Sequence, residues 1–339
     1  MKKPLYLFSN GQISRKDNTV YFDTGKEKKY VPIEGISDLY ILGEVDVTKK
    51  FLELASQTET LIHFFNYYGY YVGTFYPREH LNSGYLLLRQ AEHYLDPEKR
   101  IRLAALFVSG ATRNIRQVIK YYMNRGISGL EPTLSRIDGL AETISNVRQA
   151  KEQEEKRIEE LMALEGNIRE SYYSAFDRII KNPDFRFGAR SRRPPRNNLN
   201  ALISFGNSLL YTAVLSEIYK THLDPRIGYL HATNFRRFTL NLDVAEVFKP
   251  VIVDRVIFTL VDRGVLSNDD FEEESGGIMM KEAARKKFVA EFDKRMETVI
   301  THRKIGRPVS YRRLIRLELY KVEKHLMGEQ EYEPFSSQW

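Results

Sequence analysis

Residues 61–94 read LIHFFNYYGYYVGTFYPREHLNSGYLLLRQAEHY, and the spacing of their apolar side chains changes partway along. Two runs of β-forming residues, 61–65 and 70–75, lie on either side of turn-forming residues such as Asn66, a pattern typical of paired strands. From Gly84 onward the apolar residues recur every three or four positions, as on one face of a helix. The stretch therefore predicts that a β-rich region gives way here to a helical one.

The region before this stretch consists of short β-forming runs that alternate with turn residues such as Asn10-Gly11. The expected strands cover residues 5–9, 19–22, 30–33 and 39–42, and one short helix is expected at 49–56. The regular spacing of strands and turns predicts a small β-sandwich or barrel. The aromatic cluster NYYGYYVGTFY at 66–76 is interpreted as strand packing or a dimer surface, in preference to a base-stacking platform.

The region after this stretch has helical spacing and no internal repeat. The expected helices include residues 141–180, 200–219, 244–262, 281–301 and 311–327. The candidate at 141–180 has the charged middle KEQEEKRIEE, and whether it is one continuous helix stays open.

The fold class expected from these patterns is α+β. We predict a small N-terminal β-sandwich-like domain at 1–77, a linker at 78–88, and a larger all-α C-terminal domain at 89–339.

Composition narrows the class of protein. The chain of 339 residues is 42% hydrophobic and carries a net charge of +7, from 52 basic and 45 acidic residues. No stretch approaches the roughly 18 uninterrupted apolar residues of a membrane span, and the N-terminus lacks the apolar run of a signal peptide. We therefore expect a cytoplasmic protein.

The absence of cysteine excludes disulfides, thiolate zinc sites and a cysteine nucleophile, so any metal must bind to histidine and carboxylates.

The segment 185–198, FRFGARSRRPPRNN, interrupts the helical pattern with its arginines, two prolines and a glycine. One interpretation is a solvated surface loop. The other is a loop that grips phosphate groups, because the guanidinium fork matches phosphate oxygens.

Three places carry side chains that suit metal chemistry, and each also has a structural explanation. Glu165 lies among apolar residues, but its local context favours an exposed glutamate that pairs with Arg169 one turn later. His231 follows a turn-rich segment, where a hydrogen-bonded structural histidine is common. Asp243 and Glu246 have the spacing of a capping box, with the aspartate at the N-cap of a helix. As metal ligands, two carboxylates and one imidazole suit Mg²⁺ or Mn²⁺ and leave positions open for water and a phosphate oxygen.

The order of several sequence blocks resembles that of CRISPR-associated protein one, the spacer-acquisition integrase and endonuclease family, along essentially the whole chain. In the β-rich region the similar blocks are LYLFSNGQISRKDNTVYF (5–22), KYVPIEGISDLYILGEVDVT (29–48) and YYVGTFYP (70–77). In the helical region they are LMALEGNIRESYYSAF (161–176), RRPPRNNLNALISFGNSLLY (192–211), THLDPRIGYLH (221–231), LNLDVAEVFKPVIVDRVIF (240–258) and HLMGEQEYEPF (325–335). The chain departs from many relatives at Ala111, near which a lysine is usual, and at Asn197, where aspartate is common.

This resemblance implies a site and a reaction. It places the metal ligands and catalytic residues at Glu165, His231 and Glu246, gives Asp243 a supporting role beside them, and implies Mg²⁺ or Mn²⁺ as cofactor. The implied reaction inserts foreign DNA fragments as new spacers by attack of a 3′-hydroxyl on phosphodiesters of the repeat, and it includes cleavage of branched DNA.

The resemblance also implies partners. They are double-stranded DNA (spacer precursor and repeat), a second copy of the chain bound through the N-terminal domain, and CRISPR-associated protein two. We expect the DNA contacts to be made by Arg190, Arg192, Arg193, Arg196, Arg236 and Arg237. Two alternatives stay open, namely an integrase of a mobile element and a catalytically silent DNA-binding scaffold.

Overall fold

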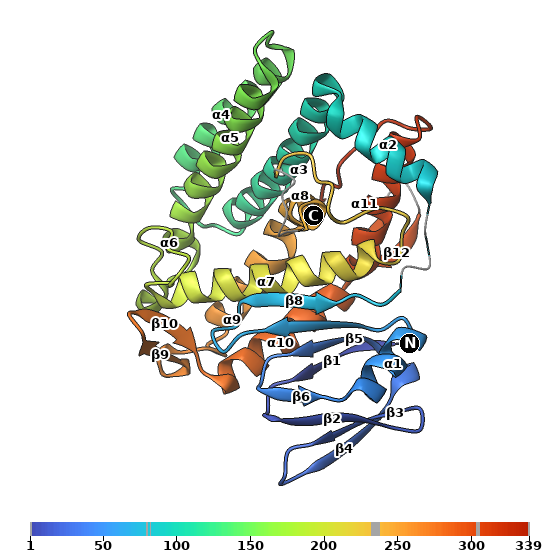
Figure 1. The fold of residues 1–339 in the computed structure, drawn as a ribbon. Helices are drawn as coiled ribbons and strands as arrows, with labels where there is room; N and C mark the ends of the chain where they lie inside the picture. Colours follow the sequence, from blue (N-terminus) through green and yellow to red (C-terminus); the bar gives the residue numbers. More distant parts are fainter. Residues whose placement is uncertain (1, 79–80, 82, 232–237, 303–305, 338–339) are drawn as a thin grey trace. The chain divides into compact units, whose positions relative to one another are not determined.

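The computed structural model describes residues 2–78, 81, 83–231, 238–302 and 306–337. These residues form two compact units, and the second begins at Ser83. Figure 1 shows strands in the first unit and mainly helices in the second. The predicted order of a sheet-rich part followed by a mostly helical part is confirmed.

The first unit is a sandwich of two four-stranded sheets, with strand orders β1-β5-β7-β8 and β4-β3-β2-β6. Its elements are β1 (Lys3–Leu7), β2 (Gly11–Lys16), β3 (Thr19–Asp23), β4 (Lys28–Pro32), β5 (Ile36–Ile41), β6 (Val45–Val47), α1 (Lys49–Gln57), β7 (Leu61–Phe65) and β8 (Tyr71–Phe75). Leu39 of one sheet and Ile13 of the other are buried in one shared core, together with Phe51 of α1. Burial of this apolar surface holds the two sheets together.

Two strands of this unit, β2 and β6, were not among the predicted strands, because turn-forming residues lie at or beside them in the sequence. Asn10-Gly11 is typical of a turn, but Gly11 begins β2 and lies close to the neighbouring strand β3. A Cβ at this position would clash with the backbone oxygen of Asp23. Glycine therefore allows a close approach of two strands here and does not end the strand. The short strand β6 pairs in parallel with the start of β2.

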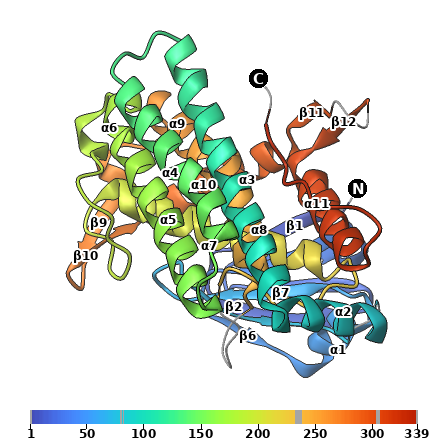
Figure 2. The same cartoon turned by 90° about the horizontal axis from the view of Figure 1, so that it is seen from above.

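The second unit is built around the long helix α3. Its helices are α2 (Gly84–Leu95), α3 (Pro97–Asn124), α4 (Glu131–Gln149), α5 (Glu154–Ser174), α6 (Phe176–Ile179), α7 (Asn198–Ile218), α8 (Leu240–Phe248), α9 (Arg255–Asp262), α10 (Glu282–Glu297) and α11 (Tyr311–Leu326). α3 packs against α4, α5 and α8 (Figure 2).

Helix α2 begins inside the segment 78–88 that was expected to be a linker. The side chain of Ser83 accepts a hydrogen bond from the backbone N–H of Leu86 at 3.2 Å, which caps the helix at this point.

The second unit is not entirely helical, in contrast to the prediction of an all-α domain. Two antiparallel hairpins lie within its described part, β9 (Phe271–Glu274) with β10 (Gly277–Met280), and β11 (Val299–His302) with β12 (Arg307–Ser310). The helix predicted at 281–301 ends at Glu297, because Val299, Ile300 and Thr301 are β-branched and favour a strand.

The helix candidate at 141–180 is interrupted at residues 150–153, so α4 and α5 form an antiparallel pair (Figure 1). Buried Arg157 of α5 donates to the backbone oxygens of Val147 and Arg148, at 3.1 and 2.6 Å. Carbonyls in the last turn of a helix lack α-helical partners, and that of Val147 also accepts the backbone N–H of Ala150 at 3.3 Å. The arginine therefore completes the end of one helix from the next.

The candidate at 244–262 is also divided, by a π-helical turn at Pro250–Asp254 between α8 and α9. The backbone N–H of Asp254 donates to the oxygen of Lys249, five residues earlier, at 3.1 Å. Proline lacks the N–H that a regular α-helix needs at its position, which accounts for the wider turn.

Among the described residues one helix, α7, is long and apolar enough to cross a membrane, but 89% of its apolar window is buried inside the protein. A helix at the centre of a folded core satisfies the same criterion, so this feature is weak evidence for a membrane span.

Candidate metal centre

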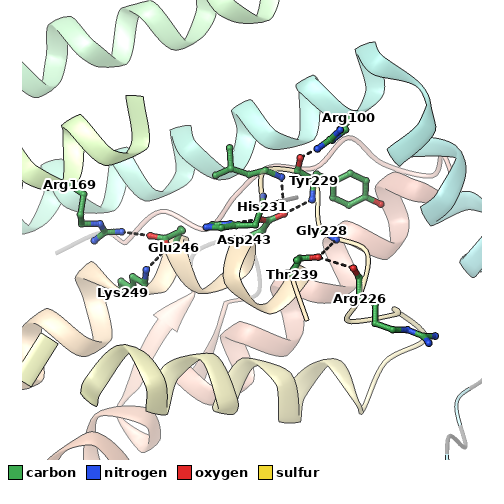
Figure 3. A network of polar contacts seen from close by, with 11 residues as sticks. Arg100, Arg169, Arg226, Gly228, Tyr229, His231, Thr239, Asp243, Glu246 and Lys249 are labelled. Carbon is green, nitrogen blue, oxygen red and sulfur yellow. Dashed lines mark hydrogen bonds and ion pairs between the residues drawn. The ribbon is translucent and has the colours of Figure 1, made fainter. Parts of the chain in front are cut away.

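The segment 228–231 brings His231 to the side of α8, where Asp243 holds it (Figure 3). The Asp243 carboxylate accepts the backbone N–H groups of Tyr229, Leu230 and His231, at 2.5, 3.1 and 3.0 Å. It also contacts Nδ1 of the His231 ring at 2.7 Å. One buried carboxylate thus fixes both the backbone and the ring of the histidine.

The start of this segment is fixed by Thr239. The N–H of Gly228 donates to Thr239 Oγ1 at 2.8 Å, and the same hydroxyl donates to the oxygen of Arg226 at 2.8 Å (Figure 3). A Cβ at position 228 would lie 2.7 Å from the backbone of Thr239. Only glycine allows the segment to pass so close to the beginning of α8.

The capping-box interpretation of Asp243 and Glu246 is wrong. α8 begins at Leu240 with Thr239 at the N-cap, so Asp243 lies inside the helix. The apolar helical pattern extends one turn further toward the N-terminus than the sequence indicated. The Asp243 carboxylate satisfies N–H groups of another segment instead of those of its own helix.

The His231 ring is positioned with one nitrogen committed to Asp243. Burial lowers the pKa of His231, but the hydrogen bond and charge of Asp243 outweigh this and leave the pKa above its ordinary value. The contact at Nδ1 makes Nε2 the nitrogen that would face a ligand. A carboxylate that orients a metal-binding histidine through its other nitrogen is a common arrangement.

Glu246 lies one turn after Asp243, and its side chain is only 4% exposed. Its Oε2 accepts from Arg169 Nη2 at 2.7 Å, and Lys249 forms an ion pair with Oε1 (Figure 3). Burial disfavours the charged carboxylate, but Lys249 and Arg169 outweigh burial and hold the pKa of Glu246 well below its ordinary value. Glu246 is therefore a buried anion with two cationic partners.

Glu165 lies on α5 and its side chain is 21% exposed, with Oε1 3.6 Å from Arg169 Nε. The pairing with Arg169 that the sequence suggested is present, but it is mostly buried. Burial and the neighbouring Glu246 raise the pKa of Glu165. The two carboxylates are close enough to disfavour each other's charge.

The three predicted ligands are thus neighbours, since the charge of Glu246 influences the pKa of both Glu165 and His231. Within the part of the chain that the structure describes, however, no three histidine or carboxylate side chains converge on one metal position. The donor types suit Mg²⁺ or Mn²⁺, and a cation would relieve the repulsion between the carboxylates. Arg169 pairs with Oε2 of Glu246 and Lys249 pairs with Oε1, so a metal ion can bind this carboxylate only if one of the two cations moves. The ligand role stays a prediction.

Two further charged residues lie beside Glu165, His231 and Glu246, and neither was identified from the sequence as part of the site. Lys249 and Asp254 lie in the apolar segment EVFKPVIVD, and both are buried. Burial raises the pKa of Asp254 to about 7, although nearby Arg169 favours the charged form. The signal in the sequence was the presence of charged residues in an apolar run, since unpaired charges are rarely buried.

Arg100 of α3 connects the elements that carry the candidate ligands. Its Nε donates to the backbone oxygen of Tyr229 at 3.2 Å, and its Nη1 donates to Glu154 at the start of α5 at 2.6 Å. One guanidinium therefore ties the histidine segment to the helix of Glu165.

The basic loop 185–198 is anchored at several points. Arg190 donates to Asn200 Oδ1 at 2.8 Å and to Ser204 Oγ at 3.0 Å, both on α7. The N–H of Ile278 on β10 donates to the oxygen of Pro195 at 2.7 Å. Arg190 therefore serves the loop's own structure.

The other predicted DNA-binding arginines of the loop are Arg192, Arg193 and Arg196, and all three are exposed. Arg236 and Arg237 lie outside the described residues. Contact of these arginines with DNA stays a prediction.

A β-sandwich unit followed by a helical unit that gathers carboxylates around a histidine defines a two-part α+β protein with a candidate metal centre. The chain belongs to the family described as CRISPR associated protein Cas1, whose model matches residues 5–294. The predicted family is confirmed.

Individual relatives are similar over the whole chain. The CRISPR-associated endonuclease Cas1 2 of Thermodesulfovibrio yellowstonii is 55% identical, with 100% of each chain covered. The solved structure of a CAS1 protein from Thermotoga maritima has a TM-score of 0.86 at 46% identity, covering 99% of this chain and 100% of that one. A casposase bound to integration product has a TM-score of 0.83 at 19% identity, covering 99% and 94%, and shows the fold alone.

Proposed function

We propose that this protein is a metal-dependent DNA integrase and endonuclease of CRISPR adaptation, and thus part of antiviral defence. It inserts DNA fragments as new spacers and also cleaves branched DNA. The observation that carries the proposal is the pairing of His231 with buried Asp243 beside Glu246 and Glu165. Full-length identity of 55% to a protein named as a CRISPR-associated endonuclease supports it.

In this proposal Glu165, His231 and Glu246 hold Mg²⁺ or Mn²⁺. When bound, such an ion supplies positive charge at the phosphorus centre and promotes ionisation of the attacking hydroxyl. Asp243 fixes the His231 ring through Nδ1 and leaves Nε2 for the ion. The cationic partners Lys249 and Arg169 outweigh burial and keep the Glu246 carboxylate charged, as a ligand must be.

The reaction needs no covalent bond to the protein. The oxygen of a DNA 3′-hydroxyl loses its proton and forms a bond to a phosphorus atom of the repeat. The bond from that phosphorus to the leaving 3′-oxygen breaks, and the leaving oxygen takes up a proton, so that one phosphodiester and one hydroxyl replace another pair. In the cleavage of branched DNA, water takes the place of the attacking hydroxyl. The lack of cysteine is consistent with this route.

We further propose that the protein acts in the cytoplasm on double-stranded DNA, as a homodimer joined through the first unit, and together with CRISPR-associated protein two. Membership of the Cas1 family supports these partners. The similar fold of a casposase bound to integration product is consistent with DNA as substrate, and it also keeps the mobile-element integrase as an alternative.

The test compares Glu165→Ala and His231→Ala with the wild type in Mn²⁺-dependent strand transfer and in DNA binding. We expect both variants to lose strand transfer while DNA binding persists. Glu160→Ala, on the exposed side of the same helix, is the matched control and should retain activity. Full activity of either site variant would rule out the proposed ligands. Wild-type protein that binds DNA but transfers no strand would favour the silent scaffold.

A further inference from the structure

Arg169 lies between three carboxylates but has a close contact with only one of them. Its Nη2 donates to Glu246 at 2.7 Å, whereas its Nε is 3.6 Å from Glu165 and its Nη1 is 3.8 Å from Asp254. The two longer distances exceed those of hydrogen bonds. The Arg169 side chain is 9% exposed, so water can compensate little of this.

Asp254 is the carboxylate near Nη1 of Arg169, and it is fully buried at the end of the π-helical turn. Among the described residues, no hydrogen bond of good geometry reaches either oxygen of its carboxylate, or Nε and Nη1 of Arg169. The Tyr172 hydroxyl is the nearby neutral group, and its interaction favours the charged form of Asp254. Nη1 of Arg169 therefore lies 3.8 Å from a buried carboxylate without closing a hydrogen bond to it, whereas Nε lies toward Glu165. Leaving such groups unpaired is costly, so the arrangement requires an explanation.

A small movement of the guanidinium would satisfy both groups. Arg169 has one acceptor at hydrogen-bond distance, Glu246, and a second one, Asp254, just beyond that distance. π-helical turns occur often at functional sites. Here the turn places a carboxylate on the side of Arg169 where Nη1 lies.

The charges explain why two positions would be needed. Glu165, Glu246 and Asp254 are accompanied by the two buried cations Arg169 and Lys249. A divalent cation at Glu165 and Glu246 adds positive charge beside the guanidinium, and it would repel the guanidinium from Glu246. A buried guanidinium without a carboxylate partner would be strongly unfavourable.

We propose that Asp254 is a positioning residue that receives the Arg169 guanidinium when a divalent cation binds to Glu165 and Glu246. Arg169 compensates Glu246 in the metal-free protein, and Asp254 compensates Arg169 in the metal-bound protein. The inference rests on the proposed function, because it takes Glu165 and Glu246 as metal ligands.

The first experiment measures Mn²⁺ affinity without DNA, by calorimetry, for the wild type and Asp254→Asn. The asparagine has the same shape but no charge, so Arg169 should stay on Glu246 and compete with the ion. We expect the Kd for Mn²⁺ to rise by about tenfold or more, as for other outer residues of metal sites. The matched control is Glu217→Gln, which removes another buried carboxylate paired with an arginine, Arg316. It should bind Mn²⁺ as the wild type does. Wild-type affinity in Asp254→Asn would overturn the inference.

A double-mutant cycle then tests whether Asp254 acts through Arg169. In an Arg169→Met background no guanidinium competes for Glu246, so Asp254→Asn should no longer change the Kd. An equal effect in both backgrounds would contradict the proposal. If Arg169→Met does not fold, Asp254→Glu decides the question, since restored charge should restore Mn²⁺ affinity. An affinity as weak as that of Asp254→Asn would overturn the charge argument.

Glu165→Ala separates this inference from the proposed function. If that variant binds Mn²⁺ like the wild type, the proposed ligands are wrong and the role of Asp254 falls with them. If Glu165→Ala loses Mn²⁺ while Asp254→Asn keeps wild-type affinity, only the role of Asp254 is overturned.

Discussion

At the scale of single residues, the candidate centre depends on buried polar groups with several partners each. Asp243 accepts three backbone N–H groups and contacts the His231 ring. Such a carboxylate cannot be replaced by a neutral group without leaving donors unpaired. The same residue therefore contributes to the stability of the fold and to the position of a candidate ligand.

Asp243→Asn should lower the free energy of unfolding by about 2 kcal/mol, because hydrogen bonds to a charged acceptor are among the stronger ones. An asparagine oxygen can accept some of the N–H groups, but its NH₂ group would face the others. Urea denaturation at neutral pH measures the change. The exposed Asp184→Asn serves as control, and equal stability of the two variants would show that Asp243 does not hold the 229–231 segment.

Gly228→Ala should destabilise the protein by about 2 kcal/mol, because the added methyl group would overlap the backbone of Thr239. Gly139→Ala is the matched control, since a Cβ there meets nothing within 4 Å in the middle of α4. That control should gain up to about 1 kcal/mol from the better helix propensity of alanine. Thermal melts of both variants test the pair, and similar melting temperatures would refute the steric argument.

At the scale of elements, local periodicity predicted where most strands and helices lie, but not where they end. All six predicted strands have a counterpart in the first unit. The interruption at 150–153 was not visible, because it depends on Arg157 reaching back to the end of α4. The start of α8 was placed one turn late, because Asp243 resembles a helix cap while its true partners lie in a separate segment.

Contacts between distant segments also limited what the sequence could predict about the candidate site. Glu165, His231 and Glu246 could be named from ordered sequence blocks, and Arg169 was visible as a neighbour of Glu165, but nothing local indicates that Arg169 pairs with Glu246. Arg169 reaches Glu246 only after α5 and α8 have packed into the same core, and Lys249 completes the cluster from the end of α8. Long-range pairing of buried charges is a property of the folded chain and has no periodic signal in the sequence.

The end of α11 carries a histidine that should make stability depend on pH. Burial, His93 and Arg102 lower the pKa of His325 to about 4, from about 6.5 in the unfolded chain. Its Nδ1 accepts the N–H of Tyr332 at 3.2 Å, which requires the neutral ring. Glu331 is the neighbouring acidic group.

Between these two pKa values the unfolded chain binds more protons, so stability should be full above about pH 6.5 and fall as the pH is lowered toward 4. His325→Gln should lose less stability over this range, while His93, whose pKa is also lowered, keeps part of the dependence. Urea denaturation at pH 7 and pH 5 measures the difference. Identical decreases in the wild type and the variant would contradict this role.

At the scale of the whole molecule, burial separates the carboxylates proposed as metal ligands from most of the arginines proposed to contact DNA. The net charge of +7 is modest for a DNA-binding protein. Carboxylates collect in the buried centre of the second unit, where they suit a metal ion, whereas arginines collect in the loop at 185–198. Within that loop, burial again divides the arginines, since Arg190 is bound to α7 while Arg192, Arg193 and Arg196 are exposed.

This division predicts two different outcomes for arginines of one loop. Replacing exposed Arg192 and Arg193 by alanine should weaken DNA binding and flatten its dependence on salt, by roughly 0.9 in the logarithmic slope for each phosphate that is no longer neutralised. Arg190→Ala should instead lower thermal stability, because it removes the hydrogen bonds to Asn200 and Ser204. Binding isotherms at several salt concentrations, with melting curves for each variant, separate the two effects. An unchanged salt slope in the double variant would mean that the exposed arginines face solvent, and that this protein binds phosphate groups elsewhere on its surface.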